Sequence, residues 1–359
     1  MSTETIIHFK KESDIPEGPR EGHCCALSSE NKLYIFGGLS PKSENLECNK
    51  LLEYDCYNGK WATLSVTGDI PPGRMGACMA SVKNKLYLFG GLNQGSGWMN
   101  DFYEFNIEGK HWKVLEPSGE RPLPRDKCTC AVVCSMICIF GGFGPQGMAD
   151  DDEYETEEEE ESVVPGESVQ FGWFNDLFLY NIESNSFSCP MQLNLGVPTP
   201  RAAHTMVSYN DCLIVFGGRD SDSRRNDISI FNTKTRKWLK FEANGTPPEP
   251  RSFHTATIFN DKMIILCGRG MKNEDFSDTY MFDITSKTWS RLANDIDKSH
   301  GRCLHSACCV NDKLYIVGGS REFNEETQQS NNVCSDVLIA DISCLQNTND
   351  EPIEKKHKT

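Results

Sequence analysis

The sequence predicts an all-β fold, a six-bladed β-propeller, and three observations support this prediction. Six short apolar segments end in a glycine pair or in the remnant of one, and they recur along the whole chain. An aromatic residue follows five of these pairs at a nearly constant distance. The residues between the landmarks are typical of short strands separated by polar turns, which is the composition of propeller blades.

The glycine pairs set the repeat length. The intervals between their first members are 53, 51, 76, 50 and 51 residues, so one blade spans about 50 residues. Only the third interval departs, by about 25 residues, and it contains a run of acidic residues. The pairs are Gly37-Gly38, Gly90-Gly91, Gly141-Gly142, Gly217-Gly218, Cys267-Gly268 and Gly318-Gly319.

The aromatic residue marks the last strand of a repeat. It lies 21 to 24 residues after the first glycine in four repeats, and at the same distance in the third once the insertion is removed. These residues are Trp61, Trp112, Phe187, Trp238 and Trp289. We expect four strands per repeat, in which the glycines let the backbone turn sharply and approach its neighbour closely.

The sixth repeat predicts how the ring closes. It has three strands, from about Cys303 to Ala340, and no aromatic strand after them. The N-terminal segment Thr5–Phe9 has strand-like composition, and we expect it to supply the missing outer strand of the last blade. Residues 1–344 then form one propeller with no second folded domain. The insertion at about 145–170 and the tail 345–359 are charged and poor in large apolar residues, so both are expected to be disordered.

Composition and charge disfavour several classes of partner. The chain has 36 basic and 52 acidic residues, a net charge of -16 that opposes binding to nucleic acid or to an anionic membrane surface. Ten of the acids lie within positions 150–161. The N-terminus lacks the pattern of a signal peptide, and no apolar run reaches membrane-spanning length. The 17 cysteines are therefore expected to be reduced thiols of a cytosolic or nuclear protein.

Several local strings carry a resemblance to a known family. They are PRDK (124–127), GGFG (141–144), GWFND (172–176), PRAAH (200–204), FGGRDSDSRRND (216–227) and PRSFH (250–254). With its repeats, the whole chain resembles kelch-repeat proteins, and more narrowly the kelch-domain-containing substrate receptors of cullin-RING ubiquitin ligases. In those receptors a propeller pocket holds the C-terminal end of a substrate, often one that ends in Gly-Gly.

The resemblance implies a peptide-binding pocket in this chain. Arg219 and Arg224 would bind the terminal carboxylate, and Ser252 and Lys127 would add hydrogen bonds. The physical case agrees, because a planar guanidinium matches a carboxylate and two arginines in one loop make a local cationic spot on an acidic protein.

The same resemblance implies an apolar wall around the terminal glycines. Trp173, Phe143 and Phe253 would form it. Two of these depart from the family pattern, since Phe143 stands where a tyrosine is usual and Phe253 where a tryptophan is usual. The lost hydroxyl and indole donors would change what the pocket accepts.

A simpler interpretation of the same residues stays open. Three acids share the loop of Arg219 and Arg224, which would then be an ordinary salt-bridged surface loop. These acids are Asp220, Asp222 and Asp227. Under this interpretation Ser252 bonds only a turn, Lys127 is a solvated charge and Trp173 is a rim aromatic without a ligand.

No catalytic or metal-binding pattern competes with the binding-module interpretation. Arg-x-x-His pairs recur at blade spacing, so we interpret them as scaffold. They are Arg20-His23, Arg201-His204, Arg251-His254 and Arg302-His305. Four closely spaced cysteines lack paired Cys-x-x-Cys motifs, so a zinc site is not expected. They are Cys128, Cys130, Cys134 and Cys138.

Kelch proteins that resemble the plant specifier proteins carry an iron site spaced Glu-x3-Asp-x3-His. Glu274 and Asp278 keep that spacing, but Phe282 occupies the histidine position and cannot ligate a metal. We also find no nucleophile-base motif and no phosphate-binding loop. The sequence therefore predicts a protein that is not an enzyme and has no cofactor or bound metal.

The predicted function is recognition of protein or peptide C-termini, as a substrate adaptor for ubiquitin ligation in a cullin-RING assembly. The alternative is a kelch scaffold that binds actin or signalling proteins through a broad surface. The related receptors continue into an apolar helical box that docks elongin and cullin, whereas this chain ends in SCLQNTNDEPIEKKHKT. Either the propeller joins no ligase, or it joins through another surface, or the sequence is truncated. The acidic run could bind calcium or basic partners, or repel acidic peptides.

Overall fold

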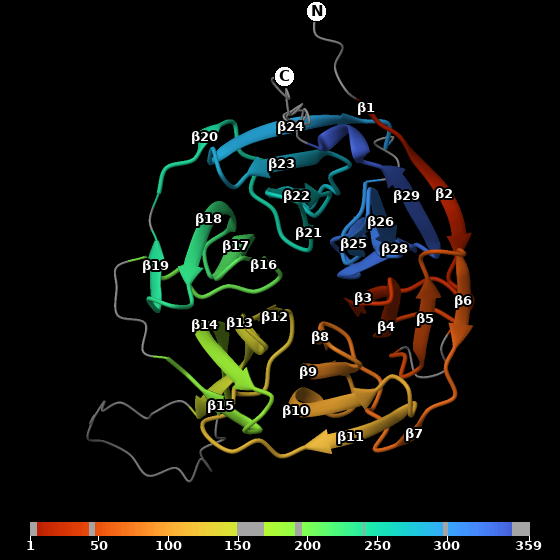
Figure 1. Cartoon of the computed structure of the whole chain (residues 1–359), viewed down its shortest axis with the longest axis vertical. Helices are drawn as coiled ribbons and strands as arrows, with labels where there is room; N and C mark the ends of the chain where they lie inside the picture. Colours follow the sequence, from red (N-terminus) through yellow and green to blue (C-terminus); the bar gives the residue numbers. More distant parts are fainter. Residues whose placement is uncertain are drawn as a thin grey trace, which may run out of the picture.

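The computed structural model describes residues 6–42, 47–148, 169–190, 196–239, 241–296 and 301–346. Six antiparallel sheets of four core strands surround a central axis, which confirms the predicted six-bladed propeller (Figure 1). The innermost strands of neighbouring blades are in contact all the way round the ring. Within these ranges no helix has the length and apolar character needed to cross a bilayer.

The strands of blades 1 to 5 run outward from the axis in chain order. Blade 1 contains β3 (Glu21–Leu27), β4 (Lys32–Leu39), β5 (Leu51–Asp55) and β6 (Lys60–Thr63), and blade 2 contains β8 (Cys78–Val82), β9 (Lys85–Asn93), β10 (Gly97–Asn106) and β11 (His111–Leu115). Blade 3 contains β12 (Thr129–Val133), β13 (Met136–Met148), β14 (Val169–Asn181) and β15 (Ser186–Ser188), and blade 4 contains β16 (Thr205–Tyr209), β17 (Cys212–Arg219), β18 (Arg224–Asn232) and β19 (Lys237–Leu239). Blade 5 contains β21 (Thr255–Phe259), β22 (Lys262–Leu266), β23 (Thr279–Asp283) and β24 (Thr288–Asn294).

Blade 6 combines the two ends of the chain. It contains β25 (Ser306–Val310), β26 (Lys313–Val317), β29 (Asp336–Asp341) and, as its outer strand, β2 (Phe9–Asp14). β2 pairs antiparallel with β29, so an N-terminal strand closes the last blade as predicted. The segment predicted for this strand, Thr5–Phe9, lies too close to the N-terminus, however. Ile6 and Ile7 form β1 (Ile6–Ile7), which instead pairs in parallel with β24 of blade 5.

Four short strands extend this framework. β7 (Thr67–Gly68) and β20 (Asn244–Gly245) add in parallel to the outer strands of blades 2 and 5. β27 (Ser320–Asn324) and β28 (Gln329–Val333) form a separate hairpin between β26 and β29 of blade 6. The sequence analysis did not predict this hairpin, which becomes important for the site below.

The predicted disordered segments need correction at their edges. Residues 145–148 and 169–170 pair within the long hairpin of β13 and β14, so the insertion begins and ends further inward than expected. Leu345 ends a short 3-10 helix, η2 (Ser343–Leu345), and packs into the core. Residues 149–168 and 347–359, including the acidic run, lie outside the described residues.

Apolar clusters fill the spaces between neighbouring blades. Because side chains alternate along a strand, each middle strand contributes to two of them. In β4, Leu33 and Ile35 pack toward blade 6, whereas Tyr34 and Phe36 pack toward blade 2. The near-continuous apolar character of these strands therefore reflects burial on both faces.

A buried arginine precedes each inner strand, and in blades 2 to 6 it braces the blade. In five blades it donates to a backbone carbonyl oxygen and to both oxygens of an aspartate on the third strand. For Arg251, the Nη1 nitrogen lies 2.6 Å from Oδ1 of Asp278 and 2.8 Å from the carbonyl oxygen of Cys267. The pairs are Arg74-Asp101, Arg125-Asp176, Arg201-Asp227, Arg251-Asp278 and Arg302-Asp336. The arginines are at most 1% exposed.

The glycine pairs are needed where these braces meet the next blade. Gly217 and Gly218 have φ angles of 63° and 95°. A Cβ atom on Gly218 would lie 2.6 Å from Cβ of His204, and one on Gly217 would lie 2.9 Å from Cε1 of His254. Larger residues would therefore clash with the inner strands of blades 4 and 5.

Candidate peptide-binding site

A closed ring of backbone hydrogen bonds surrounds the axis at one face. In each blade the residue two positions after the buried arginine has a left-handed backbone, and its N–H donates to the carbonyl oxygen of the same position in the preceding blade. The six N···O distances lie between 2.7 and 3.1 Å. The residues are Gly22, Gly76, Lys127, Ala203, Phe253 and Leu304. The ring fixes where these side chains start, and only Lys127, Phe253 and Leu304 are large.

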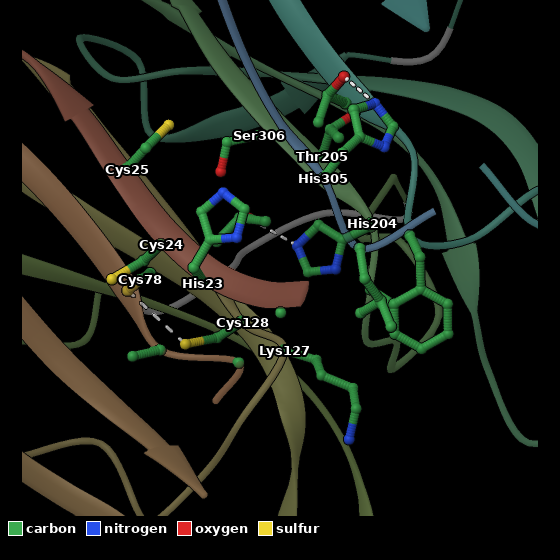
Figure 2. A pocket seen from close by; sticks show the side chains of 18 of the residues that line it. His23, Cys24, Cys25, Cys78, Lys127, Cys128, His204, Thr205, His305 and Ser306 are labelled. Atoms are coloured by element: carbon green, nitrogen blue, oxygen red, sulfur yellow. Dashed lines mark hydrogen bonds between the residues drawn. The ribbon is translucent and has the colours of Figure 1, made fainter. Parts of the chain in front are cut away.

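Below this ring an axial channel of about 250 Å³ is lined by the inner strands (Figure 2). Three of its histidines bond a threonine of the preceding blade, at 2.8 Å for His204 and Thr129. Burial and the adjacent arginine lower the pKa of His204 to about 3, so this ring is neutral at physiological pH. The recurring Arg-x-x-His pairs thus lie where scaffold residues are expected.

Above the ring is a second cavity, of about 490 Å³, between the ring and the loops of that face. It is lined by four of the predicted site residues: Arg219, Arg224, Lys127 and Phe253. Arg219 ends β17 and Arg224 begins β18, and the two residues are paired across the strands. The short turn between these strands therefore presents both guanidinium groups to the cavity.

The acids of this loop are engaged by other arginines. Asp220 and Asp222 pair with Arg225, and Asp227 pairs with buried Arg201. In the described part of the chain no carboxylate lies within ion-pair distance of Arg219 or Arg224. The salt-bridged-loop interpretation therefore fails for these two residues.

Arg224 is held from two sides by neutral acceptors. Its Nε donates to Oγ of Ser252 at 2.9 Å, and its Nη2 donates to Oδ1 of Asn273 at 2.8 Å. Burial, with Arg219 and Arg269 nearby, lowers the pKa of Arg224, so an added anion would stabilise its charged form. Ser252 is fully buried and does not line the cavity, so it positions Arg224 rather than facing a ligand.

Lys127 extends from the ring away from the channel histidines (Figure 2). Its Nζ lies 2.5 Å from Oδ2 of Asp126, which is fully buried and also accepts a hydrogen bond from Nε1 of Trp98. Lys127 is thus an ion-paired residue at the cavity wall rather than a solvated charge.

Phe143 and Trp173 lie beside the cavity and are not among the residues that line it. Their ring centroids are 5.0 Å apart, and they belong to an aromatic cluster with Trp98 and Phe171 on the hairpins of blades 2 and 3. Phe143 exchanges backbone hydrogen bonds with Asp126, which connects this cluster to Lys127. The two residues could contact a longer ligand only outside the cavity.

The sequence analysis missed several residues that line the cavity, among them Glu21 of blade 1 and Arg269 and Asn273 of blade 5. Arg269 could have been found, because it follows Cys267-Gly268 as Arg219 follows its own glycine pair. Its Nε lies 3.2 Å from Oδ1 of Asp275, and its guanidinium stacks 4.2 Å from the ring of Phe323 on β27. The unpredicted hairpin therefore forms part of the cavity wall.

The rejected metal sites are dispersed in the structure. Cys128 and Cys138 pack on opposite faces of blade 3, and Asp278 is bound to Arg251 while Phe282 is fully buried. All 17 cysteines are free thiols. Within the described ranges no three His, Cys, Asp or Glu side chains gather as a metal site.

Comparison with known proteins agrees with this architecture. Residues 76–289 match the family model "FBX42, beta-propeller domain", and residues 301–337 match the kelch motif. The chain is 30% identical over 333 residues to kelch domain-containing protein 1 of Homo sapiens, covering 89% of this chain and 80% of that protein. Kelch domain-containing protein 2 of Bos taurus is 28% identical over 311 residues (84% and 75%), and kelch domain-containing protein 3 of Rattus norvegicus is 25% identical over 336 residues (86% and 80%). The chain therefore belongs to the kelch-repeat β-propeller family.

Proposed function

We propose that this propeller binds the free C-terminal end of partner proteins and performs no catalysis. The observation that carries the proposal is the pair Arg219 and Arg224, which line a cavity at the axis without a carboxylate partner among the described residues. Kelch propellers generally bind proteins, and a pocket with two unpaired guanidinium groups suits an anionic group of the partner.

The cavity favours a chain end over an internal acidic side chain. The hydrogen-bonded ring lies at its floor, and Phe253 and Leu304 contribute apolar surface there. When the residues that precede a terminal carboxylate are small, the carboxylate can reach Arg224 without forcing a bulky side chain against this floor. Ser252 and Asn273 hold Arg224 in place beforehand, which reduces the entropy lost on binding.

The test is binding of purified protein to peptides that end in Gly-Gly, each prepared with a free carboxylate and as the C-terminal amide. We expect amidation to weaken binding at least tenfold, because it removes charge-assisted hydrogen bonds in a partly buried site. The double variant Arg219→Ala/Arg224→Ala should lose the same discrimination. The matched control is Arg236→Ala/Arg291→Ala, which removes equal charge from two exposed arginines outside the cavity.

Equal binding of acid and amide would refute capture of a chain end and favour the broad-surface scaffold. An adaptor role in ubiquitin ligation rests on the resemblance to ligase receptors. It is tested by mixing the propeller with purified elongin and cullin components and measuring complex formation by size-exclusion chromatography. No complex would leave a C-terminus reader that acts without that ligase class.

A further inference from the structure

The charges that line the cavity are not all compensated. Lys127 is paired with Asp126, and Arg269 is paired with Asp275. Among the described residues three charges then remain without an ion-pair partner within 4 Å. They are the cations Arg219 and Arg224 and the anion Glu21.

These remaining charges lie on opposite sides of the axis. Glu21 is the first residue of β3 in blade 1, whereas Arg219 and Arg224 belong to β17 and β18 in blade 4. In a ring of six blades the first and fourth face each other, as the positions of β3 and β17 show (Figure 1). The cavity is therefore polarised across its width, cationic at blade 4 and anionic at blade 1.

The surroundings of Glu21 leave its negative charge in need of a cation. Burial raises its pKa and nearby Asp275 adds to this, while Ser320 and Arg269 offset only part of the effect. The pKa of Asp275 is itself raised by burial although Arg269 contacts it. One guanidinium thus serves two carboxylates, and an added cation would stabilise both.

We propose that the cavity selects protein ends that carry a lysine or arginine within their last four residues. This proposal rests on the proposed function: the terminal carboxylate lies at Arg219 and Arg224, and the chain crosses the mouth toward blade 1. The basic side chain then reaches the carboxylate of Glu21. Gln94, Gln328 and Gln329 line the same cavity and offer neutral hydrogen-bonding groups to the backbone of such a ligand.

The experiment uses peptides ending in Gly-Gly in which lysine, glutamine or glutamate is placed in turn at the third and fourth positions from the end. A second series without terminal glycines places the same residues at the penultimate position. We expect the wild-type protein to bind the best lysine peptide about five- to tenfold more tightly than the matching glutamine peptide, and the glutamate peptide least tightly. Glu21→Gln should abolish this preference, and Glu21→Lys should invert it toward glutamate.

Glu326→Gln is the matched control, since it removes one negative charge from the exposed turn of the β27–β28 hairpin outside the cavity. It should keep the lysine preference, which separates a contact at Glu21 from a general effect of net charge. Thermal unfolding of each variant shows whether it is folded. If Glu21→Lys does not fold, the loss of lysine preference in Glu21→Gln alone tests the proposal.

The two proposals fail in different ways. If acid peptides bind better than amides but lysine, glutamine and glutamate peptides bind equally, the selection by Glu21 is refuted and C-terminus binding stands. A lysine preference that persists in Glu21→Gln also refutes it. If amidation changes nothing at any position, the proposed function fails and this inference fails with it.

Discussion

Arg224 donates from Nε to the hydroxyl oxygen of Ser252 at 2.9 Å, across the boundary between blades 4 and 5. This bond joins a cavity-lining arginine, which we propose binds the ligand, to the fully buried side chain of Ser252. Asn273 completes the arrangement, accepting from Arg224 while its Nδ2 donates to Oε1 of Glu325 on the turn of the blade 6 hairpin. Three consecutive blades thus determine the orientation of one guanidinium group.

The first prediction concerns Asn273. Asn273→Ala removes an acceptor that orients Arg224, so we expect affinity for a free C-terminus to fall about three- to tenfold. Asn273→Asp should cost more, because the new carboxylate would pair with Arg224 and compete with the ligand. Isothermal titration with acid and amide peptides measures both effects. Arg236→Ala, at an exposed site outside the cavity, serves as the control, and equal affinities for all four proteins would contradict the positioning role.

The periodicity of the sequence predicted the structural features that recur from blade to blade, but it could not predict features that occur in one blade only. The glycine pairs, the aromatic strands and the arginine braces recur, so six blades follow from their spacing. Among the described residues the hairpin of β27 and β28 has no counterpart as a separate sheet in another blade, and its polar sequence resembles an ordinary loop. Arg269 lies between these cases, because its repeat position was visible but its contact with Phe323 depends on that hairpin.

The closing strand shows a different reason for error. Composition favoured Thr5–Phe9, which is more apolar than the segment that follows. An outer strand, however, is largely exposed and tolerates the polar sequence of β2, whereas Ile7 is fully buried beside blade 5. Apolar content therefore identified a buried residue rather than the strand that closes the blade.

The second prediction concerns the blade that lacks a complete brace. Lys50 occupies the position at which the other blades carry aspartate, as the pairing of Leu51 with Phe36 shows. Within the described part of the chain, Nε and Nη1 of buried Arg20 have no hydrogen-bond partner. Lys50→Asp should supply the missing carboxylate and raise the free energy of unfolding by about 1 to 3 kcal/mol, measured by urea denaturation. Lys60→Asp makes the same charge change at an exposed site. A gain shared by both variants would show a net-charge effect instead.

The third prediction concerns acid stability. Burial and Arg201 lower the pKa of His204 to about 3, below its ordinary value of 6.5, so between these values the unfolded chain binds a proton that the folded chain does not. Stability is therefore complete above pH 6.5 and lost as pH falls, by about 1.4 kcal/mol for this residue between pH 7.5 and 5.5. His204→Gln should reduce the loss measured by urea denaturation at the two pH values. The exposed control His8→Gln should not, and an unchanged loss in His204→Gln would contradict the assignment.

The fourth prediction compares two adjacent isoleucines of β1. Ile7 is fully buried against blades 5 and 6, whereas Ile6 is 48% exposed. Ile7→Ala should lower the free energy of unfolding by about 3 kcal/mol through lost burial and a residual cavity. Ile6→Ala should change it by about 0.5 kcal/mol or less. Similar values for the two variants in chemical denaturation would show that β1 is not anchored as described.

The pairing of β2 with β29 also determines the order in which the blades can be completed during synthesis of the chain. Ser335 contacts Asp14 across 321 positions of the chain, so blade 6 stays incomplete until β29 has left the ribosome. Earlier blades can form as they emerge, but β2 must wait unpaired while the five intervening repeats are translated. The cavity at the axis is lined by residues of blade 1 and of the β27–β28 hairpin, so binding activity should be acquired only after that hairpin has been synthesised.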